Sequence, residues 1–281
     1  MHKVLAIETS CDETSVSIVS NSGDIYKIHS NIVASQIEDH SKWGGVVPEL
    51  AARKHLELLP FVLEQALEES KISIEEIDVI ASTVAPGLVG CLRVGSITAR
   101  SLCILYSKPF LGIHHLEGHL SSILFSKNYP KPPFLTLLVS GGHTELIKVG
   151  ERREMQRLGR SYDDAAGEAF DKVGRLLGLS YPGGPAIAKI AKKGNASKFN
   201  LPKCKISDKE GGFLKYDFSF SGLKTAVLRL VEKINLNGDE IPIPDIAASF
   251  ERVVAEVLVE RTIKCANDYG LDNVVVVGEI G

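Results

Sequence analysis

The feature that most constrains the fold is an internal repeat. Residues 4–19 read VLAIETSCDETSVSIV, and residues 134–149 read FLTLLVSGGHTELIKV. Each segment is an apolar run, a short polar turn and an alternating run, which predicts a strand, a tight turn and a second strand. One constant offset of 130 residues aligns identical residues, among them Leu5 with Leu135, Ser10 with Ser140, and Thr14 with Thr144. The repeat predicts a duplicated domain.

A second pair of segments supports the duplication. IDVIASTVAPG (77–87) and LDNVVVVGEIG (271–281) both read as a buried strand that ends in glycine. A helical run follows the first segment, whereas the sequence stops after the second. Strands alternate with helical stretches, so the predicted class is α/β. We expect a first lobe over residues 1–130 and a second lobe over 131–281 that lacks a helix and further elements at its end.

Three helices are expected from apolar residues at helical spacing. The first, residues 47–70, contains Pro60, which should kink the helix or split it. The second opens with an N-cap at Ser161. The third should stop at Gly270. Its apolar stripe is Ile246, Phe250, Val254 and Leu258. Residues 193–215 are rich in Lys, Gly and Pro and read as an irregular insertion.

Composition limits the classes of function. The net charge of −3 gives no general basic surface, so nucleic acid would need a local patch or a partner's surface. No apolar run approaches the ~20 residues of a membrane span, and the N-terminal segment MHKVLAIETS reads as a strand rather than a signal peptide. The 5 cysteines form no CxxC pair, which suits a reducing compartment with most of them buried. We expect a cytoplasmic protein without a membrane segment.

The stretch HHLEGHL places His115 and His119 four residues apart, on one face of a helix, where both could bind one metal ion. In zinc proteases the catalytic glutamate directly follows the first histidine. Here Glu117 comes two residues after His115, at ~100° per residue on the opposite side of the helix, which argues against a protease. The alternative is two histidines on an ordinary polar helix face.

Several polar or glycine-rich turns are candidate ligand sites. The SGG loop at 140–142 allows backbone N–H groups to approach an anion, although a plain hairpin explains it equally well. The turn YPGGP fits a ligand-facing loop, with an ordinary turn as the alternative, and Asp171 in GEAFDK would by itself be a solvated helix carboxylate. Asp12 and Glu13 follow the first strand, where duplication would direct them into a cleft between the lobes. We assign them the catalytic role, with ordinary turn chemistry as the alternative for Asp12.

Seven motifs occur in order along the chain: IETSCDETS, GGVVPELAARKH, APGLVGCLRVG, HHLEGHL, LVSGGHTEL, DDAAGEAFDKVGRLLGLSYPGGP and DFSFSGLKT. Together they resemble the bacterial tRNA N(6)-adenosine threonylcarbamoyltransferases, the TsaD family. The resemblance extends from residue 3 to about residue 277, and several of the motifs are long and specific.

The resemblance implies a duplicated, two-lobed fold of the actin, Hsp70 and sugar-kinase type, here with an incomplete second lobe. It implies transfer of a threonylcarbamoyl group from threonylcarbamoyl-adenylate to the exocyclic amine of the adenosine 3′ of the anticodon, in tRNAs that read codons beginning with A. It also implies TsaB-like and TsaE-like partner proteins, the latter an ATPase.

The resemblance also implies roles for individual residues. His115 and His119 match the family's metal-binding histidines, with one divalent ion, iron or alternatively zinc. The remaining matches are substrate contacts: Leu138, Val139, Ser140, Gly141, Gly142, Asp171 and Gly184, with ribose expected at Asp171.

The C-terminal segment departs from the family pattern. In the family, the last strand continues into a GGVxAN turn, and a later aspartate completes the metal site, whereas VVVVGEIG departs after Gly278. We therefore expect weak metal retention and an uncovered sheet edge. Two alternatives to an active transferase stay open. One is a truncated, catalytically impaired remnant that retains partner binding, and the other is a small-molecule kinase or ATPase of the same fold.

Overall fold

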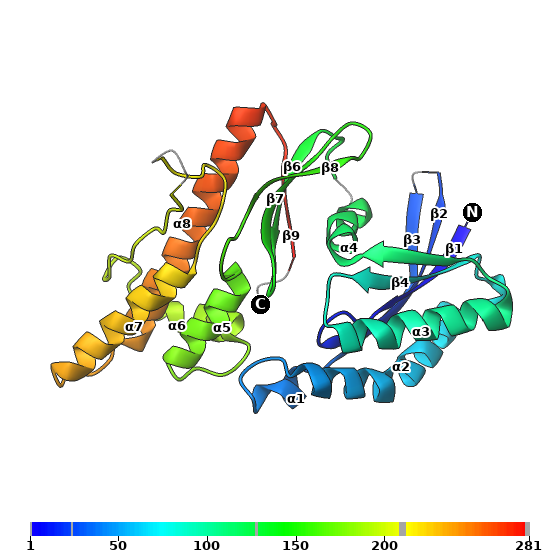
Figure 1. Ribbon diagram of the computed structural model, residues 1–281, viewed down its shortest axis with the longest axis horizontal. Coiled ribbons are helices and arrows are strands. Elements are labelled where there is room, and N and C mark those ends of the chain that lie inside the picture. Colours follow the sequence, from blue (N-terminus) through cyan, green and yellow to red (C-terminus); the bar gives the residue numbers. More distant parts are fainter. Residues whose placement is uncertain (1, 24, 127–128, 208–211, 279–281) are drawn as a thin grey trace. The chain divides into compact units, whose positions relative to one another are not determined.

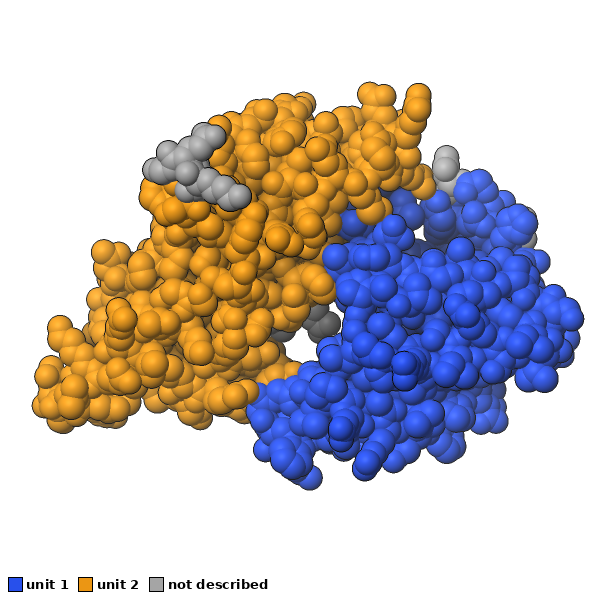
Figure 2. All heavy atoms as spheres, viewed as in Figure 1, with its two compact units in different colours: residues 1–129 blue, residues 130–281 orange. Residues whose placement is uncertain are grey.

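The protein consists of two compact units, Met1–Tyr129 and Pro130–Gly281 (Figure 2). The computed structural model describes residues 2–23, 25–126, 129–207 and 212–278. Each unit is built on one sheet with helices packed against it, which confirms the α/β class. The last three residues of the strand segment expected over 271–281 lie outside the described residues.

Unit 1 is a five-stranded sheet of order β3-β2-β1-β4-β5, with α2 and α3 covering one face (Figure 1). Its strands are β1 (His2–Glu8), β2 (Glu13–Ser22), β3 (Ile25–Ser35), β4 (Val79–Ala85) and β5 (Phe110–His114). Its helices are α1 (Ile37–Ser41), α2 (Pro48–Ser70), η1 (Ile74–Glu76), α3 (Val89–Tyr106), α4 (His115–Ser121) and η2 (Ser122–Phe125). Inward side chains such as Leu5, Ile7 and Ile18 form its core because alternate residues of a strand face the covering helices.

Unit 2 is a four-stranded sheet of order β8-β7-β6-β9, in which β9 is an edge strand. Its strands are β6 (Phe134–Val139), β7 (Thr144–Val149), β8 (Met155–Arg160) and β9 (Val274–Val277). Its helices are α5 (Ala166–Leu176), α6 (Gly183–Ala191), α7 (Ser221–Leu236) and α8 (Ile243–Tyr269). The described part of residues 193–215 forms no helix or strand beyond an isolated bridge, which confirms the predicted irregular insertion.

The two sheets repeat the same strand pairing in the same register, which confirms the duplication. In both units the hairpin strands are antiparallel and the following strand is parallel to the first. The matching pairs are Val4 with Val19 and Phe134 with Val149 in the hairpins, and Leu5 with Ile80 and Leu135 with Val274 across the parallel strands. The hairpin pairs differ by the constant offset of the sequence repeat.

The predicted split of the first helix at Pro60 is wrong, because α2 runs unbroken from Pro48 to Ser70. A proline at position 60 removes the hydrogen bond to the carbonyl of Leu56. Both residues lie on the solvent side of α2, and Leu56 is 64% exposed. Water can satisfy a carbonyl in that position, which explains why the helix tolerates the proline.

The predicted N-cap at Ser161 is wrong. Helix α5 begins at Ala166, and the Ser161 hydroxyl instead donates to the carbonyl of Asp164 at 2.6 Å. The N–H of Ala166 donates to Thr144 Oγ1 at 2.8 Å. Thr144 of β7 therefore accepts the hydrogen bond from the first N–H group of α5, the role that a capping residue next to the helix would otherwise fill.

Helix α8 matches the prediction for the third helix. Gly270 ends it in the left-handed conformation, with φ 62°, which glycine adopts without a steric penalty. All four residues of the predicted stripe are buried in the core of unit 2. Helix α8 packs against α6 and α7 (Figure 1).

Among the described helices, α3 alone has the length and apolar composition of a membrane span. Its buried residues recur every fourth position, and they are Cys91, Gly95, Ala99 and Cys103. This face packs on β4 and α2 within unit 1. All five cysteines are free, and three of them are buried.

Two leucines of α7 provide a matched test of the unit 2 core. Leu223 is 2% exposed, whereas Leu236 is 88% exposed. We expect Leu223→Ala to lower the free energy of unfolding by about 2–5 kcal/mol, because truncating a buried leucine side chain leaves a cavity in the core. Leu236→Ala on the same helix should change it by less than ~0.5 kcal/mol. Urea unfolding followed by circular dichroism measures both, and equal effects would contradict the placement of α7.

Candidate functional site

The turn Thr9–Asp12 follows β1 and carries the first predicted catalytic carboxylate, Asp12. Three consecutive carbonyls of this turn each accept a hydrogen bond from a different segment. The pairs are Leu88 N to Ser10 O at 2.8 Å, His55 Nε2 to Cys11 O at 2.9 Å, and Gln36 N to Asp12 O at 3.0 Å. The turn conformation is therefore fixed by residues remote in sequence.

Helix α3 also holds this turn through Thr9. The N–H of Gly95 donates to Thr9 Oγ1 at 3.1 Å, and the Thr9 hydroxyl donates to the carbonyl of Cys91 at 2.8 Å. A Cβ atom at position 95 would lie 2.4 Å from Thr9 Oγ1. Only glycine allows the helix to approach the turn this closely.

His55, from α2, is fully buried behind the turn. Because the Cys11 carbonyl can only accept, Nε2 of His55 carries the hydrogen. Its Nδ1 then accepts from the Thr14 hydroxyl at 2.7 Å and from Gln36 Nε2 at 3.3 Å. Burial lowers the pKa of His55 by more than the Cys11 carbonyl raises it. The imidazole is thus held neutral in one tautomer.

The same network continues to His40, which is also fully buried. The backbone N–H of Val47 donates to His40 Nδ1 at 3.2 Å, so His40 Nε2 carries the hydrogen and donates to Gln36 Oε1 at 3.2 Å. Backbone groups at both ends therefore define the direction of every hydrogen bond in the network.

The two candidate metal-binding histidines lie side by side on α4. Nε2 of His115 is 3.1 Å from Nε2 of His119, and the ring centroids are 4.6 Å apart. Glu117 is exposed on this helix and falls ~200° from His115 by helix geometry. The shared face predicted for the two histidines is confirmed.

The separation of the two imidazoles suits a shared metal ion. Two nitrogen ligands at about 2.0–2.1 Å from one ion, in tetrahedral geometry, lie about 3.3 Å apart. The observed separation is 3.1 Å. Within the described residues no third histidine, cysteine, aspartate or glutamate joins the pair in a metal-binding group. The pair alone therefore offers two ligands.

Glu8, the last residue of β1, lies behind His115. Its carboxylate accepts from the N–H of Ser10 at 2.5 Å and from the hydroxyl of Thr83, and its Oε2 lies 3.5 Å from His115 Nδ1. Burial raises the pKa of Glu8, but hydrogen bonds from His115, Ser10 and Thr83 outweigh burial and lower that pKa from 4.5 to about 2. Glu8 is thus an ionised acceptor.

Ser10 connects the turn to α4. Its hydroxyl lies 3.1 Å from His115 Nδ1. Unit 1 therefore brings together the Thr9–Asp12 turn and the histidine pair. Asp12 is half-buried in the turn, and Glu13, also half-buried, begins β2 opposite Ser35.

In unit 2 the predicted substrate loop lies against the first turn of α5. The carbonyl of Ser140 accepts from the N–H of Gly167 at 3.3 Å, and a Cβ atom at position 167 would lie 2.7 Å from Gly141 Cα. Gly141 and Gly142 are exposed, whereas the side chains of Leu138 and Val139 are buried in the sheet. The accessible part of the loop is its two glycines.

Asp171 and Gly184 are also brought together. Asp171 lies on α5, and its Oδ1 accepts from the N–H of Gly183 at 2.7 Å. Gly183 and Gly184 begin α6 and are buried. The Asp171 carboxylate therefore satisfies a donor at the start of the helix that carries Gly184.

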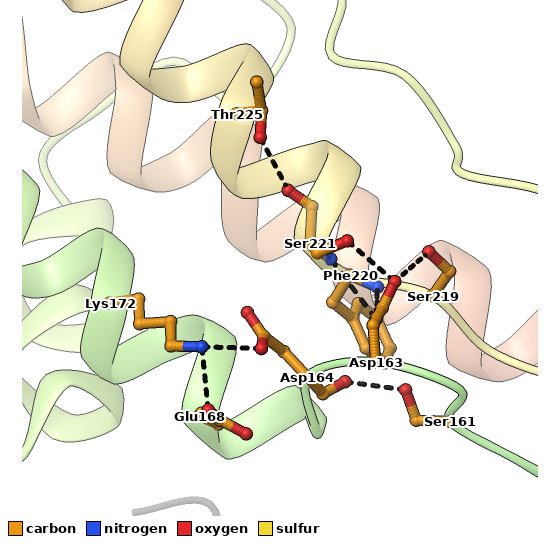
Figure 3. Close-up of polar contacts among 9 residues, drawn as sticks. All are labelled: Ser161, Asp163, Asp164, Glu168, Lys172, Ser219, Phe220, Ser221 and Thr225. Carbon is orange, nitrogen blue, oxygen red and sulfur yellow. Dashed lines mark hydrogen bonds and ion pairs between the residues drawn. The ribbon is translucent and has the colours of Figure 1, made fainter.

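Asp163 anchors the segment before α5 to the start of α7 (Figure 3). Its carboxylate accepts from the Phe220 N–H at 2.8 Å, from the Ser219 hydroxyl at 2.5 Å, and from both the hydroxyl and the N–H of Ser221 at 2.7 and 3.3 Å. Partial burial raises the pKa of Asp163, but these bonds lower it further than burial raises it. Beside it, Lys172 pairs with Asp164 and Glu168 (Figure 3).

Sequence reasoning missed Glu8, His55 and Asp163. Glu8 ends a buried strand immediately before a polar turn, and that position was a usable signal. His55 and Asp163 gave no local signal, because their partners lie 44 and up to 58 residues away.

Comparisons with known proteins point to one family. A family profile described as tRNA N6-adenosine threonylcarbamoyltransferase matches residues 27–281. A protein of that name from Prochlorococcus marinus subsp. pastoris is 97% identical over 280 residues, which cover 100% of this chain and 79% of that protein. A protein of the same name from Prochlorococcus marinus strain NATL1A is 63% identical over the same shares.

One solved structure supports the fold alone. The activator of the 2-hydroxyisocaproyl-CoA dehydratase from Clostridium difficile, with bound ADPNP, is similar with a TM-score of 0.50 and 16% sequence identity. The similarity covers 99% of this chain and 80% of that one. It is consistent with a two-lobed, actin-like arrangement.

His55 predicts a pH dependence of stability. Its pKa is lowered in the folded protein, so the unfolded chain takes up the proton first as the pH falls below about 6.5. Stability should be complete above that pH and decline as the pH falls towards the lowered folded pKa. His55→Gln should be less stable at pH 8 but show a flatter decline. Urea midpoints between pH 8 and 5 measure this, and exposed His2→Gln, which should keep the wild-type slope, is the control.

Asp163 predicts a stability effect at the start of α7. Asp163→Ala should lower the free energy of unfolding by about 0.5–2 kcal/mol, the usual cost of losing a helix cap. Asp239→Ala, at an exposed position beyond the other end of α7, is the matched control and should have little effect. Urea unfolding compares the two, and an equal response would exclude a capping role.

Proposed function

The chain belongs to the tRNA N6-adenosine threonylcarbamoyltransferase family, TsaD, and we propose from this premise how its own residues serve that reaction. As a member of the family it is an enzyme of tRNA modification. It transfers the threonylcarbamoyl group from threonylcarbamoyl-adenylate to the exocyclic amine of the adenosine 3′ of the anticodon. The observation that carries this function is the 97% identity to a curated transferase along the whole chain.

His115 and His119 are the proposed ligands of one divalent metal ion, iron or alternatively zinc. The 3.1 Å separation of their Nε2 atoms supports this role, and imidazole suits both metals. A bound ion would act as a Lewis acid that polarises a carbonyl oxygen of the threonylcarbamoyl group. With two protein ligands in the described part of the chain, we expect weak metal binding.

The remaining site residues are proposed to bind threonylcarbamoyl-adenylate and to accept a proton from the attacking amine. In the transfer, a bond forms between the adenine amine nitrogen and the carbamoyl carbon, and the bond to the adenylate phosphate oxygen breaks as AMP leaves. The exposed glycines of the Leu138–Gly142 loop offer N–H groups to the phosphate, and Asp171 and Gly184 contribute to the nucleotide site. Asp12 and Glu13 are the candidate acceptors of the proton lost by the amine.

Family membership supports a proposal about the partners. We propose that the protein works in the cytoplasm with TsaB-like and TsaE-like proteins. The net charge of −3 supports a tRNA site that is a local basic patch or is completed by a partner, because the protein has no general excess of positive charge.

The test is a transfer assay with the 281-residue chain, threonylcarbamoyl-adenylate, tRNA and both partner proteins. We expect His115→Ala and His119→Ala each to abolish bound metal and to reduce transfer by at least ~10-fold, because one of two ligands is lost. Glu117→Ala on the same helix is the matched control and should retain both properties. Metal content by elemental analysis and modified nucleoside by mass spectrometry are the readouts.

The same assay separates the alternatives. Metal-dependent transfer supports the transferase. Partner binding without transfer, while a full-length relative is active, would support an impaired protein that retains only partner binding. Phosphorylation of a small molecule or ATP hydrolysis without tRNA would support a kinase or ATPase. Unchanged metal in both histidine variants would contradict the proposed metal site.

A further inference from the structure

Glu8 is held as a hydrogen-bond acceptor facing His115. Ser10 N–H and Thr83 O–H donate to its two oxygens, one each. These donors come from the turn and from β4, so neither depends on α4. The carboxylate therefore has a fixed position, and Oε2 lies 3.5 Å from Nδ1 of His115.

We propose that Glu8 is a positioning residue that keeps the imidazole hydrogen of His115 on Nδ1, so that Nε2 presents its lone pair to a metal ion. A hydrogen on Nδ1 faces two acceptors, the Ser10 hydroxyl oxygen at 3.1 Å and Glu8 Oε2. A lone pair on Nδ1 would instead face the negative carboxylate. The geometry thus selects one tautomer.

The contact on the other side of the ring agrees with this tautomer. Nε2 of His115 lies 3.1 Å from Nε2 of His119, and two nitrogens at that distance need one donor and one acceptor. With Nδ1 protonated, His115 Nε2 is the acceptor. A ligating histidine commonly donates its second N–H to a carboxylate, which orients the ring and raises its basicity.

The inference deepens the proposed metal site, on which its affinity measurement rests. Its second measurement does not need metal. In the metal-free chain at pH 8, nitrogen chemical shifts of His115 distinguish hydrogen on Nδ1 from hydrogen on Nε2. We expect the Nδ1 form in the wild type and a detectable Nε2 population in Glu8→Gln, because the amide can donate to Nδ1 through its NH2 group.

The affinity measurement uses zinc alone in competition with a chromogenic chelator. Glu8→Gln should weaken zinc binding by about 10- to 100-fold, the usual effect of losing a partner behind a metal ligand. Glu117→Gln removes the same charge from an exposed position on α4 and should bind as the wild type does. Ser10→Ala removes the second acceptor and should cause a smaller loss. Thermal unfolding of each variant checks that the fold is intact.

The outcomes are distinguishable. Wild-type affinity and the Nδ1 form retained in Glu8→Gln would overturn the inference. A larger loss in Ser10→Ala than in Glu8→Gln would assign the orienting role to Ser10 and also overturn it. If His115→Ala and His119→Ala bind zinc as the wild type does, the proposed metal site fails. The tautomer of His115 still decides the role of Glu8 in that case.

Discussion

The arrangement of unit 1 depends on the hydrogen bonding of the turn Thr9–Asp12. Three successive carbonyls lie where strand pairing has ended, and a backbone acceptor removed from water needs a donor. The donors come from the start of α1, from His55 on α2 and from the residue before α3. Each helix that covers the sheet is therefore also tied to the turn. The same turn carries Ser10, whose hydroxyl lies 3.1 Å from His115 Nδ1. The bonds that hold the turn therefore also hold one neighbour of the histidine pair in place.

Unit 2 repeats the strands but satisfies the corresponding turn differently. Thr14 and Thr144 occupy equivalent positions, yet Thr14 donates to His55, whereas Thr144 accepts the N–H of Ala166. One hydroxyl thus completes a buried polar network and the other caps a helix. The sheet is the shared part of the duplication, because register is set by the pattern of buried side chains. The connections are free to differ, so each copy can present a different chemical surface.

The parts of the fold that the sequence predicted are those encoded locally. The hairpins and α8 follow from periodicity, and the paired histidines follow from helical spacing. The N-cap at Ser161 was wrong because Thr144 on another strand supplies the cap. The role of Glu8 was missed because two of its three partners, Thr83 and His115, lie 75 and 107 residues away, and the position before the turn does not reveal them. A carboxylate gains such a role only when the sheet brings β4 and α4 beside it.

The carboxylate of Glu8 gives His115 a defined surrounding on the Nδ1 side of its ring. Glu8 Oε2 lies 3.5 Å from His115 Nδ1, and in our proposal this acceptor keeps the hydrogen on Nδ1, so that the Nε2 facing His119 keeps its lone pair. We therefore propose that β1 and the turn after it, and not α4 alone, determine how well the histidine pair binds a metal ion. A histidine pair at the same spacing on an isolated helix would lack this bias, because either ring nitrogen could then carry the hydrogen.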